Sequence, residues 1–106
     1  MSAPVRQRFR ILYRRSSEDL LQLLVETLGV EFRKGEASWR SETYGGSRFE
    51  LTRDGDQEYT LILDHDPQHP MFSSQEKSFV RVERFPEWLP LVLGKEEAEC
   101  TFMGGC

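Results

Sequence analysis

The chain has 106 residues, of which 38% are hydrophobic and 30% charged, and its formal net charge is -4. About 100 residues make one domain, and this balance is enough for one core under a charged surface. It excludes an intrinsically disordered chain, and no apolar run approaches the ~20 residues of a membrane span. No apolar secretory segment follows Met1, so we expect a single cytoplasmic domain over residues 1–106.

The charge is unevenly distributed. Residues 1–40 carry eight basic and five acidic groups, whereas residues 41–106 carry six basic and thirteen acidic groups. An acidic second half repels phosphate and attracts cationic surfaces. It therefore disfavours nucleic acid as the partner and favours a basic protein.

The first predicted element is a half-buried strand. From Val5 to Tyr13 apolar residues alternate with arginines, which is typical of a strand with one face in the core. We interpret the arginines as a solvated face neutralised by acidic neighbouring strands, rather than as a basic binding stripe.

An amphipathic helix is predicted over residues 17–28. Ser16, Ser17, Glu18 and Asp19 supply the hydroxyls and acids typical of a helix start, and leucines then recur at helical spacing. Gly29 stands where a left-handed C-cap belongs. The leucine stripe is expected to face the core.

Three strands with tight turns follow. Residues 37–44, 48–53 and 56–63 read as strands, separated by Gly45-Gly46 and Asp54-Gly55. This pattern predicts an antiparallel meander packed against the helix. Its buried face should consist of Phe49, Leu51, Tyr59, Leu61 and Leu63.

The last third is predicted to be less regular. A loop is expected from Asp66 to about Lys77 because it contains two prolines, then a strand over 78–84. Pro90 should limit 85–90 to a short helical turn, with closing strands at 91–93 and 98–103. The fold class is therefore α+β, with an antiparallel sheet of four to six strands and one main amphipathic helix on one face.

Catalytic motifs are not evident. The strongest candidate is a divalent-metal site at Asp64, Asp66 and His69, although strand alternation turns His65 away from the two aspartates. A calcium loop starting at Asp54 fails at Tyr59, where glycine is needed. We expect no cofactor and no catalytic residue. One alternative is left open: a nucleophile and a base that are distant in the sequence and are brought together only by folding.

The two cysteines do not form a disulfide or zinc motif. Cys100 and Cys106 are few, close together and near the end of the chain, so reduced thiols are expected.

A cluster of acids is the remaining feature. Five acids fall within thirteen residues, on or beside one hairpin, and Trp88 between two prolines is the preferred aromatic anchor. Carboxylates pair well with arginine and lysine of a partner. The predicted partner-binding residues are Asp54, Asp56, Glu58, Asp64, Asp66 and Trp88.

The layout also resembles a known group of proteins. The segment Tyr44-Gly45-Gly46-x-x-Phe49, the turn at Asp54-Gly55, the strand ending Leu63-Asp64-His65-Asp66, and residues 80–86 follow in an order similar to small α+β immunity proteins of bacterial polymorphic and contact-dependent toxin systems. The resemblance implies a non-enzymatic protein that binds a cognate toxin, often a nuclease, and blocks its active site.

Three functional hypotheses follow. The first is a protein-binding module, an immunity or inhibitor protein that neutralises a basic toxin. The second is a metal-assisted hydrolase using Asp64, Asp66 and His69. The third is a structural protein that self-associates through a sheet edge, with the arginine-rich strand around Phe9 and Ile11 as the proposed edge.

Overall fold

The computed structural model describes residues 5–36, 38–42, 46–66, 68, 71–73 and 79–105. The elements in chain order are β1 (Val5–Leu12), α1 (Ser17–Leu28), β2 (Phe32–Lys34), β3 (Ser38–Ser41), β4 (Ser47–Arg53), β5 (Glu58–His65), β6 (Met71–Ser73), β7 (Phe79–Arg81), a 3₁₀ turn (Val82–Arg84), α2 (Phe85–Gly94) and β8 (Glu99–Gly105).

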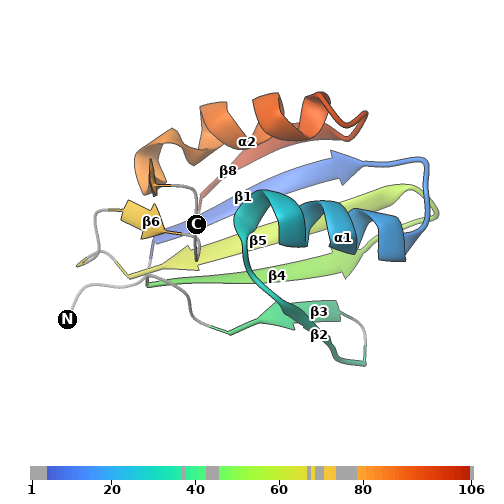
Figure 1. Ribbon diagram of the computed structural model, residues 1–106, viewed down its shortest axis with the longest axis horizontal. Helices are drawn as coiled ribbons and strands as arrows, with labels where there is room; N and C mark the ends of the chain where they lie inside the picture. The colour runs from blue at the N-terminus through green and yellow to red at the C-terminus, as the bar shows by residue number, and fades with distance from the viewer. Residues whose placement is uncertain are drawn as a thin grey trace.

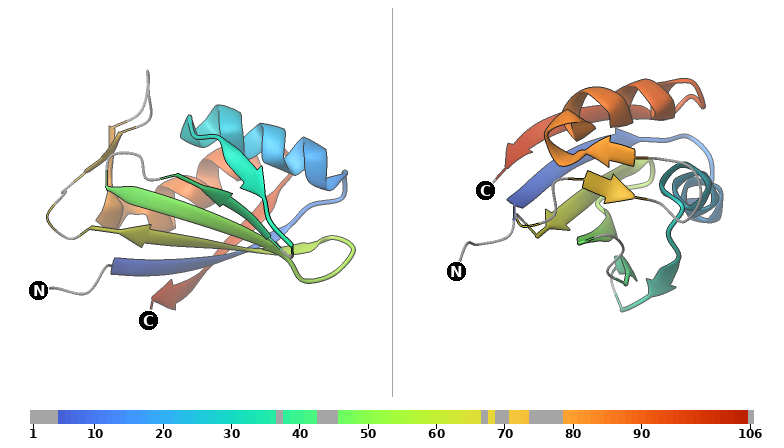
Figure 2. Two further views of the ribbon diagram at one scale, coloured as in Figure 1. Left: turned by 90° about the horizontal axis from the view of Figure 1, so that it is seen from below. Right: turned by 60° about the vertical axis from the view of Figure 1, so that its left-hand side comes forward.

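The protein is built as two layers. Six strands form one antiparallel sheet in the order β2-β3-β4-β5-β1-β8, and β6 and β7 form a separate hairpin. Both helices lie on the same side of the large sheet (Figures 1 and 2). Neither described helix lies on the other side of that sheet (Figure 2). The predicted α+β class with an antiparallel sheet of four to six strands is confirmed.

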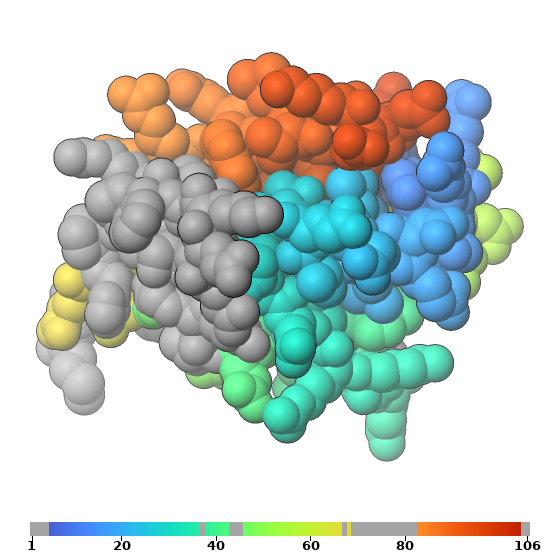
Figure 3. All heavy atoms as spheres, in the orientation of Figure 1, coloured from blue at the N-terminus to red at the C-terminus, as the bar shows by residue number. Residues whose placement is uncertain are grey.

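The space-filling view shows the helical side of the molecule (Figure 3). The surface of α2 forms one band and α1 a second band beside it. The buried apolar side chains of sheet and helices form one cluster beneath these bands. The core therefore lies entirely between the sheet and its two helices.

The first strand and the first helix follow the sequence pattern. Phe9 and Ile11 of β1 are fully buried, while the arginines of the strand, Arg6, Arg8 and Arg10, are exposed. The Ser16 hydroxyl accepts a hydrogen bond from the Asp19 amide at 3.2 Å, which caps α1. Gly29 ends the helix with φ 68°, and its amide donates to the Val25 carbonyl at 2.8 Å. The predicted bounds of this helix are confirmed.

The central meander is confirmed, but its strand bounds differ from the prediction. Strands β3, β4 and β5 pair in succession, and β2 adds a short fourth strand on the β3 side. β3 covers 38–41 of the predicted 37–44, and β5 runs from 58 to 65 in place of 56–63. Ala37 and residues 43–45, which include Gly45 of the first predicted turn, lie outside the described residues. All five residues predicted for the buried face are buried: Phe49, Leu51, Tyr59, Leu61 and Leu63.

The prediction that Pro90 limits its segment to a short helical turn is wrong. Residues 85–94 form α2 with Pro90 inside it, so residues 91–93 are helical and not a closing strand. An internal proline removes one hydrogen bond and costs about 3 kcal/mol. Full burial of Phe85, Leu89 and Leu93, spaced four residues apart on one helix face, offsets that cost. The expected single main helix is therefore two.

The segment between β5 and α2 differs in part from the prediction. The expected loop contains β6, which pairs with β7, and the expected strand over 78–84 is a strand only at 79–81. The loop was predicted because prolines are excluded from central strands, but Met71–Ser73 follows Pro70 and itself contains no proline. These three residues are therefore free to form a strand. The closing strand predicted at 98–103 is confirmed as β8.

β1 is an interior strand. It pairs with β5 on one side and with β8 on the other, so the hypothesis that the arginine-rich strand is a free edge is wrong. The edges of the described sheet are β2 and β8. Neither described helix is long and apolar enough to cross a membrane.

Replacing the central core leucine of α1 tests the packing of the two layers. Leu24→Ala should lower the free energy of unfolding by about 2–5 kcal/mol, because the lost methyl groups leave a cavity. Urea denaturation followed by circular dichroism measures the change. The matched control is Gln22→Ala on the exposed side of the same helix, for which a change within about 0.5 kcal/mol is expected.

Candidate functional site

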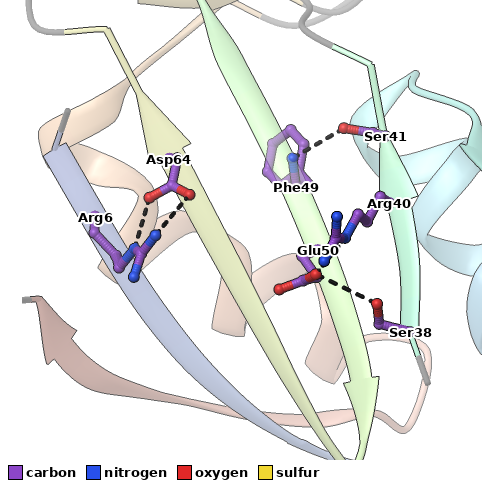
Figure 4. Close-up of polar contacts among 7 residues, drawn as sticks. All are labelled: Arg6, Ser38, Arg40, Ser41, Phe49, Glu50 and Asp64. Carbon is purple, nitrogen blue, oxygen red and sulfur yellow. Dashed lines mark hydrogen bonds and ion pairs between the residues drawn. The ribbon is translucent and has the colours of Figure 1, made fainter. Parts of the chain in front are cut away.

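The open face of the sheet is crossed by ion pairs. The Arg6 guanidinium donates to both carboxylate oxygens of Asp64, at 2.7 and 3.2 Å (Figure 4). Arg10 donates to Glu58 at 2.7 Å. These contacts join β1 to β5, as the sequence pattern suggested. The interpretation of the arginines as a neutralised face is confirmed for these two. Arg8 and Arg48 have no ion-pair partner among the described residues.

A second set of polar contacts ties β3 to β4. Arg40 donates to Glu50 at 2.6 Å, and the Ser38 hydroxyl donates to the same carboxylate oxygen at 3.3 Å. The Ser41 hydroxyl accepts from the Phe49 amide at 2.9 Å, so a side chain replaces a ladder bond there (Figure 4). These pairs hold the register of the meander and leave Glu50 occupied.

The predicted partner-binding residues do not form one surface. Asp54 and Asp56 lie at the β4–β5 turn, whereas Asp66 follows the far end of β5, about 25 Å away for an eight-residue strand. Glu58 and Asp64 are engaged by arginines. Trp88 is half-buried on α2, in the helical layer, where its ring meets Phe85 edge-on. The six residues therefore occupy three separate places.

The candidate metal residues are only partly described. Asp64 directs both oxygens at Arg6, and Asp66 accepts the Gln68 amide at 2.9 Å, while His69 lies outside the described residues. Within the described ranges no three histidine, cysteine or acidic side chains gather closely enough to hold a metal ion. Asp64 would have to leave its arginine to become a ligand.

Folding does bring one hydroxyl and one imidazole together. Ser47 and His65 face each other across β4 and β5, with the hydroxyl and the imidazole Nδ1 2.5 Å apart. Both side chains are buried. The hairpin turn at Asp54-Gly55 predicted that β4 and β5 pair, but the sequence marks neither residue as the partner of the other. In the structure their hydrogen bond holds this end of β4 against β5.

An open groove lies at the opposite end of the sheet. It has a volume of about 970 Å³ and runs between the β1–α1 connection, the β4–β5 turn and the α2–β8 turn. Asp56, Glu58, Glu97 and Glu99 contribute four carboxylates, against the two guanidinium groups of Arg14 and Arg15 that line the same groove; we call this the acidic groove.

Half of the groove carboxylates were missed from the sequence. Glu97 and Glu99 come from the α2–β8 turn, about forty residues after Asp56 in the chain. The signal was present as the acidic run Glu96-Glu97-x-Glu99. The sequence could not connect this run with Asp56, because only the sheet order brings the α2–β8 turn beside the β4–β5 turn.

Glu97 is held in an unusual backbone conformation. Its φ is 65°, in the left-handed region, and it is the one described non-glycine residue with positive φ. Its amide donates to the Gly94 carbonyl at 3.2 Å, and the Ala98 amide donates to the Leu93 carbonyl at 3.1 Å. This is the Schellman pattern that ends a helix, in which glycine is preferred at the position of Glu97. The turn therefore presents a carboxylate where stability favours glycine.

Cys100 is a free, half-buried thiol on β8. Burial raises its pKa to about 12. Because the thiolate is the reactive form, this cysteine is protonated and unreactive at neutral pH. Cys106 lies outside the described residues.

The architecture defines the chain as an α+β protein with an open antiparallel sheet and an acidic groove at one end. Comparison with protein-family models, with curated proteins and with solved structures finds no match to this chain. The function must therefore be argued from the groove itself.

The conformation of Glu97 generates a stability prediction. Glu97→Gly should raise the free energy of unfolding by up to about 1 kcal/mol, because glycine adopts positive φ without the Cβ clash. Thermal and urea denaturation measure the gain. Glu96→Gly removes the same charge from the neighbouring position, where no positive φ has to be relieved, and should give no gain. Equal stabilisation by both variants would assign the effect to charge.

The thiol of Cys100 generates a reactivity prediction. In a Cys106→Ser background, iodoacetamide should modify native Cys100 at pH 8 roughly 50-fold more slowly than the urea-unfolded chain, because the raised pKa leaves little thiolate. The pKa of the Cys100 thiol is higher in the folded chain than in the unfolded chain. The stabilisation from burying the neutral thiol is therefore fully present below pH ~8.5 and is lost as the pH rises toward 12. Equal rates in both states would show an accessible, ordinary thiol.

Proposed function

We propose that this chain is a non-enzymatic protein-binding module of the immunity or inhibitor kind, which neutralises a basic protein partner through the acidic groove. The proposal rests on three groove carboxylates that have no ion-pair partner among the described residues. Asp56, Glu97 and Glu99 line the groove, and none of them forms an ion pair within the described part of the chain. They are available to a partner.

The groove suits a protein side chain better than a small apolar ligand. It is open and its lining is mostly charged or polar, with Leu12, Tyr13 and Ala98 as the apolar part. Small-molecule pockets are usually enclosed and mainly hydrophobic. Arginine or lysine side chains of a partner would find carboxylates from two turns on either side, and would be steered there by the acidic charge.

A basic partner also fits the resemblance in layout to small bacterial immunity proteins. Surfaces that bind nucleic acid are basic because they neutralise phosphates. A groove with several free carboxylates is complementary to such a surface. An inhibitor of a nuclease therefore needs no catalytic residues, only acids held at the correct place by a rigid sheet.

A pull-down from native cell lysate tests the groove. Tagged wild-type protein should recover one basic protein at low salt and release it at moderate salt, because charge attraction is screened. The double variant Asp56→Asn, Glu97→Gln should lose most of that partner. The matched control is Glu31→Gln, Glu36→Gln, which also removes two carboxylate charges, from exposed positions away from the groove.

The two variants separate the possible outcomes. Loss of the partner in both would indicate a general charge effect and refute the groove, while retention in both would refute a role for its carboxylates. Turnover of a substrate by the purified wild-type protein would refute the non-enzymatic assignment. Circular dichroism of each variant shows that the fold is intact.

A further inference from the structure

The two edges of the described sheet differ in how well they resist pairing. β2 is three residues long and carries Arg33 and Lys34, and short charged strands are the usual protection of an edge. β8 is seven residues long, with the sequence ECTFMGG and Glu99 as its one charge. One side of β8 pairs with β1, and its other side has no neighbouring strand in the described sheet. β8 is thus the unprotected edge.

Two exposed apolar side chains lie on that edge strand itself. The large exposed hydrophobic residues of the described chain are Val5 (41%), Leu91 (65%), Phe102 (38%) and Met103 (58%). Phe102 and Met103 are neighbours on β8, whereas Leu91 lies on the side of α2 opposite its buried residues (Figure 1). An edge strand that exposes adjacent apolar side chains and carries one charge is open to pairing with another strand.

We propose that β8 pairs antiparallel with β8 of a second copy of this chain, giving a two-fold symmetric dimer in which the two six-stranded sheets are joined. Strand addition at an edge supplies main-chain hydrogen bonds to the unpaired amides and carbonyls of β8. A two-fold axis closes the assembly at two copies, because each β8 has only one free side. This inference does not depend on the function proposed for the acidic groove.

The sequence of β8 is compatible with pairing to itself. A β-bulge interrupts its pairing with β1 beyond Phe102, and Gly104 has φ 96°, so the regular part is Glu99–Met103. An antiparallel register centred on Thr101 uses this part alone. It sets Thr101 opposite its own copy, Cys100 opposite Phe102, and Glu99 opposite Met103 of the second chain.

That register avoids the main cost of self-pairing. Like charges directly opposite each other destabilise a strand pair, and Glu99 here faces a methionine. Cys100 and Phe102 lie on the helical side of the sheet, because they pair with the buried residues Ile11 and Phe9. The dimer would therefore cover Phe102 with apolar atoms of the second copy. Because β8 carries a single charge and exposes apolar side chains, a second copy of β8 is the favoured partner for this edge.

The oligomeric state is the first test. Light scattering coupled to size exclusion should give a mass of twice 12.4 kDa at high concentration and dissociation on dilution. Met103→Glu should weaken the dimer at least about tenfold, because it sets a carboxylate directly opposite Glu99 of the second copy at two symmetric places, and like charges that face each other destabilise a strand pair. The matched control is Val5→Glu, which adds the same charge at an exposed residue of interior strand β1 and should leave the dimer unchanged.

Cross-linking tests the register. In a Cys100→Ser, Cys106→Ser background, Thr101→Cys should form a covalent dimer on mild oxidation, because opposite Cβ atoms lie about 4.5–5.5 Å apart. Thr52→Cys is the control: it lies on the same open face in interior strand β4 and should stay monomeric on denaturing gels. A monomeric mass for the wild type at about 1 mM, where a micromolar dimer would be nearly complete, would overturn the proposal. So would masses that rise without limit, or equal cross-linking at both positions.

Discussion

The whole fold depends on the pairing of β1 with two strands from distant parts of the chain. β5 lies on one side of it and β8 on the other. Its inward side chains, Phe9 and Ile11, enter the core that both helices cover. Two of its outward arginines, Arg6 and Arg10, form ion pairs on the open face. Without β1, the meander and the α2–β8 unit would have no common sheet, and the acidic groove between their turns would not exist.

Local patterns were sufficient to predict most of this architecture. The alternation in β1, the capped leucine stripe of α1 and the alternating strands on either side of Asp54-Gly55 each depend on residues close in sequence, and all three were confirmed. The prediction failed at α2, where local chemistry and tertiary packing disagree. Pro90 disfavours a helix, but three buried side chains on one face favour it more strongly.

The candidate site was harder to predict because it is assembled from distant segments. Asp56 was recognised from a local cluster of acids, yet Glu97 and Glu99 join it only through the sheet order. The sequence also predicted that acids neutralise the β1 arginines without identifying Glu58 and Asp64 as those acids. Their partners, Arg10 and Arg6, lie 48 and 58 positions away, and the strand register that joins them is not visible in the sequence.

The interior position of β1 also has a consequence for how the chain folds. Nearly the whole chain separates β1 from β8, and contacts between such distant segments form slowly because a large loop must close first. Until β8 arrives, β1 is itself an open edge with phenylalanine and isoleucine on its inner face. The arginines at every second position then act as gatekeepers, since charge on a transient edge discourages pairing with other unfinished chains. The residues that lock the finished sheet also keep the nascent one from aggregating.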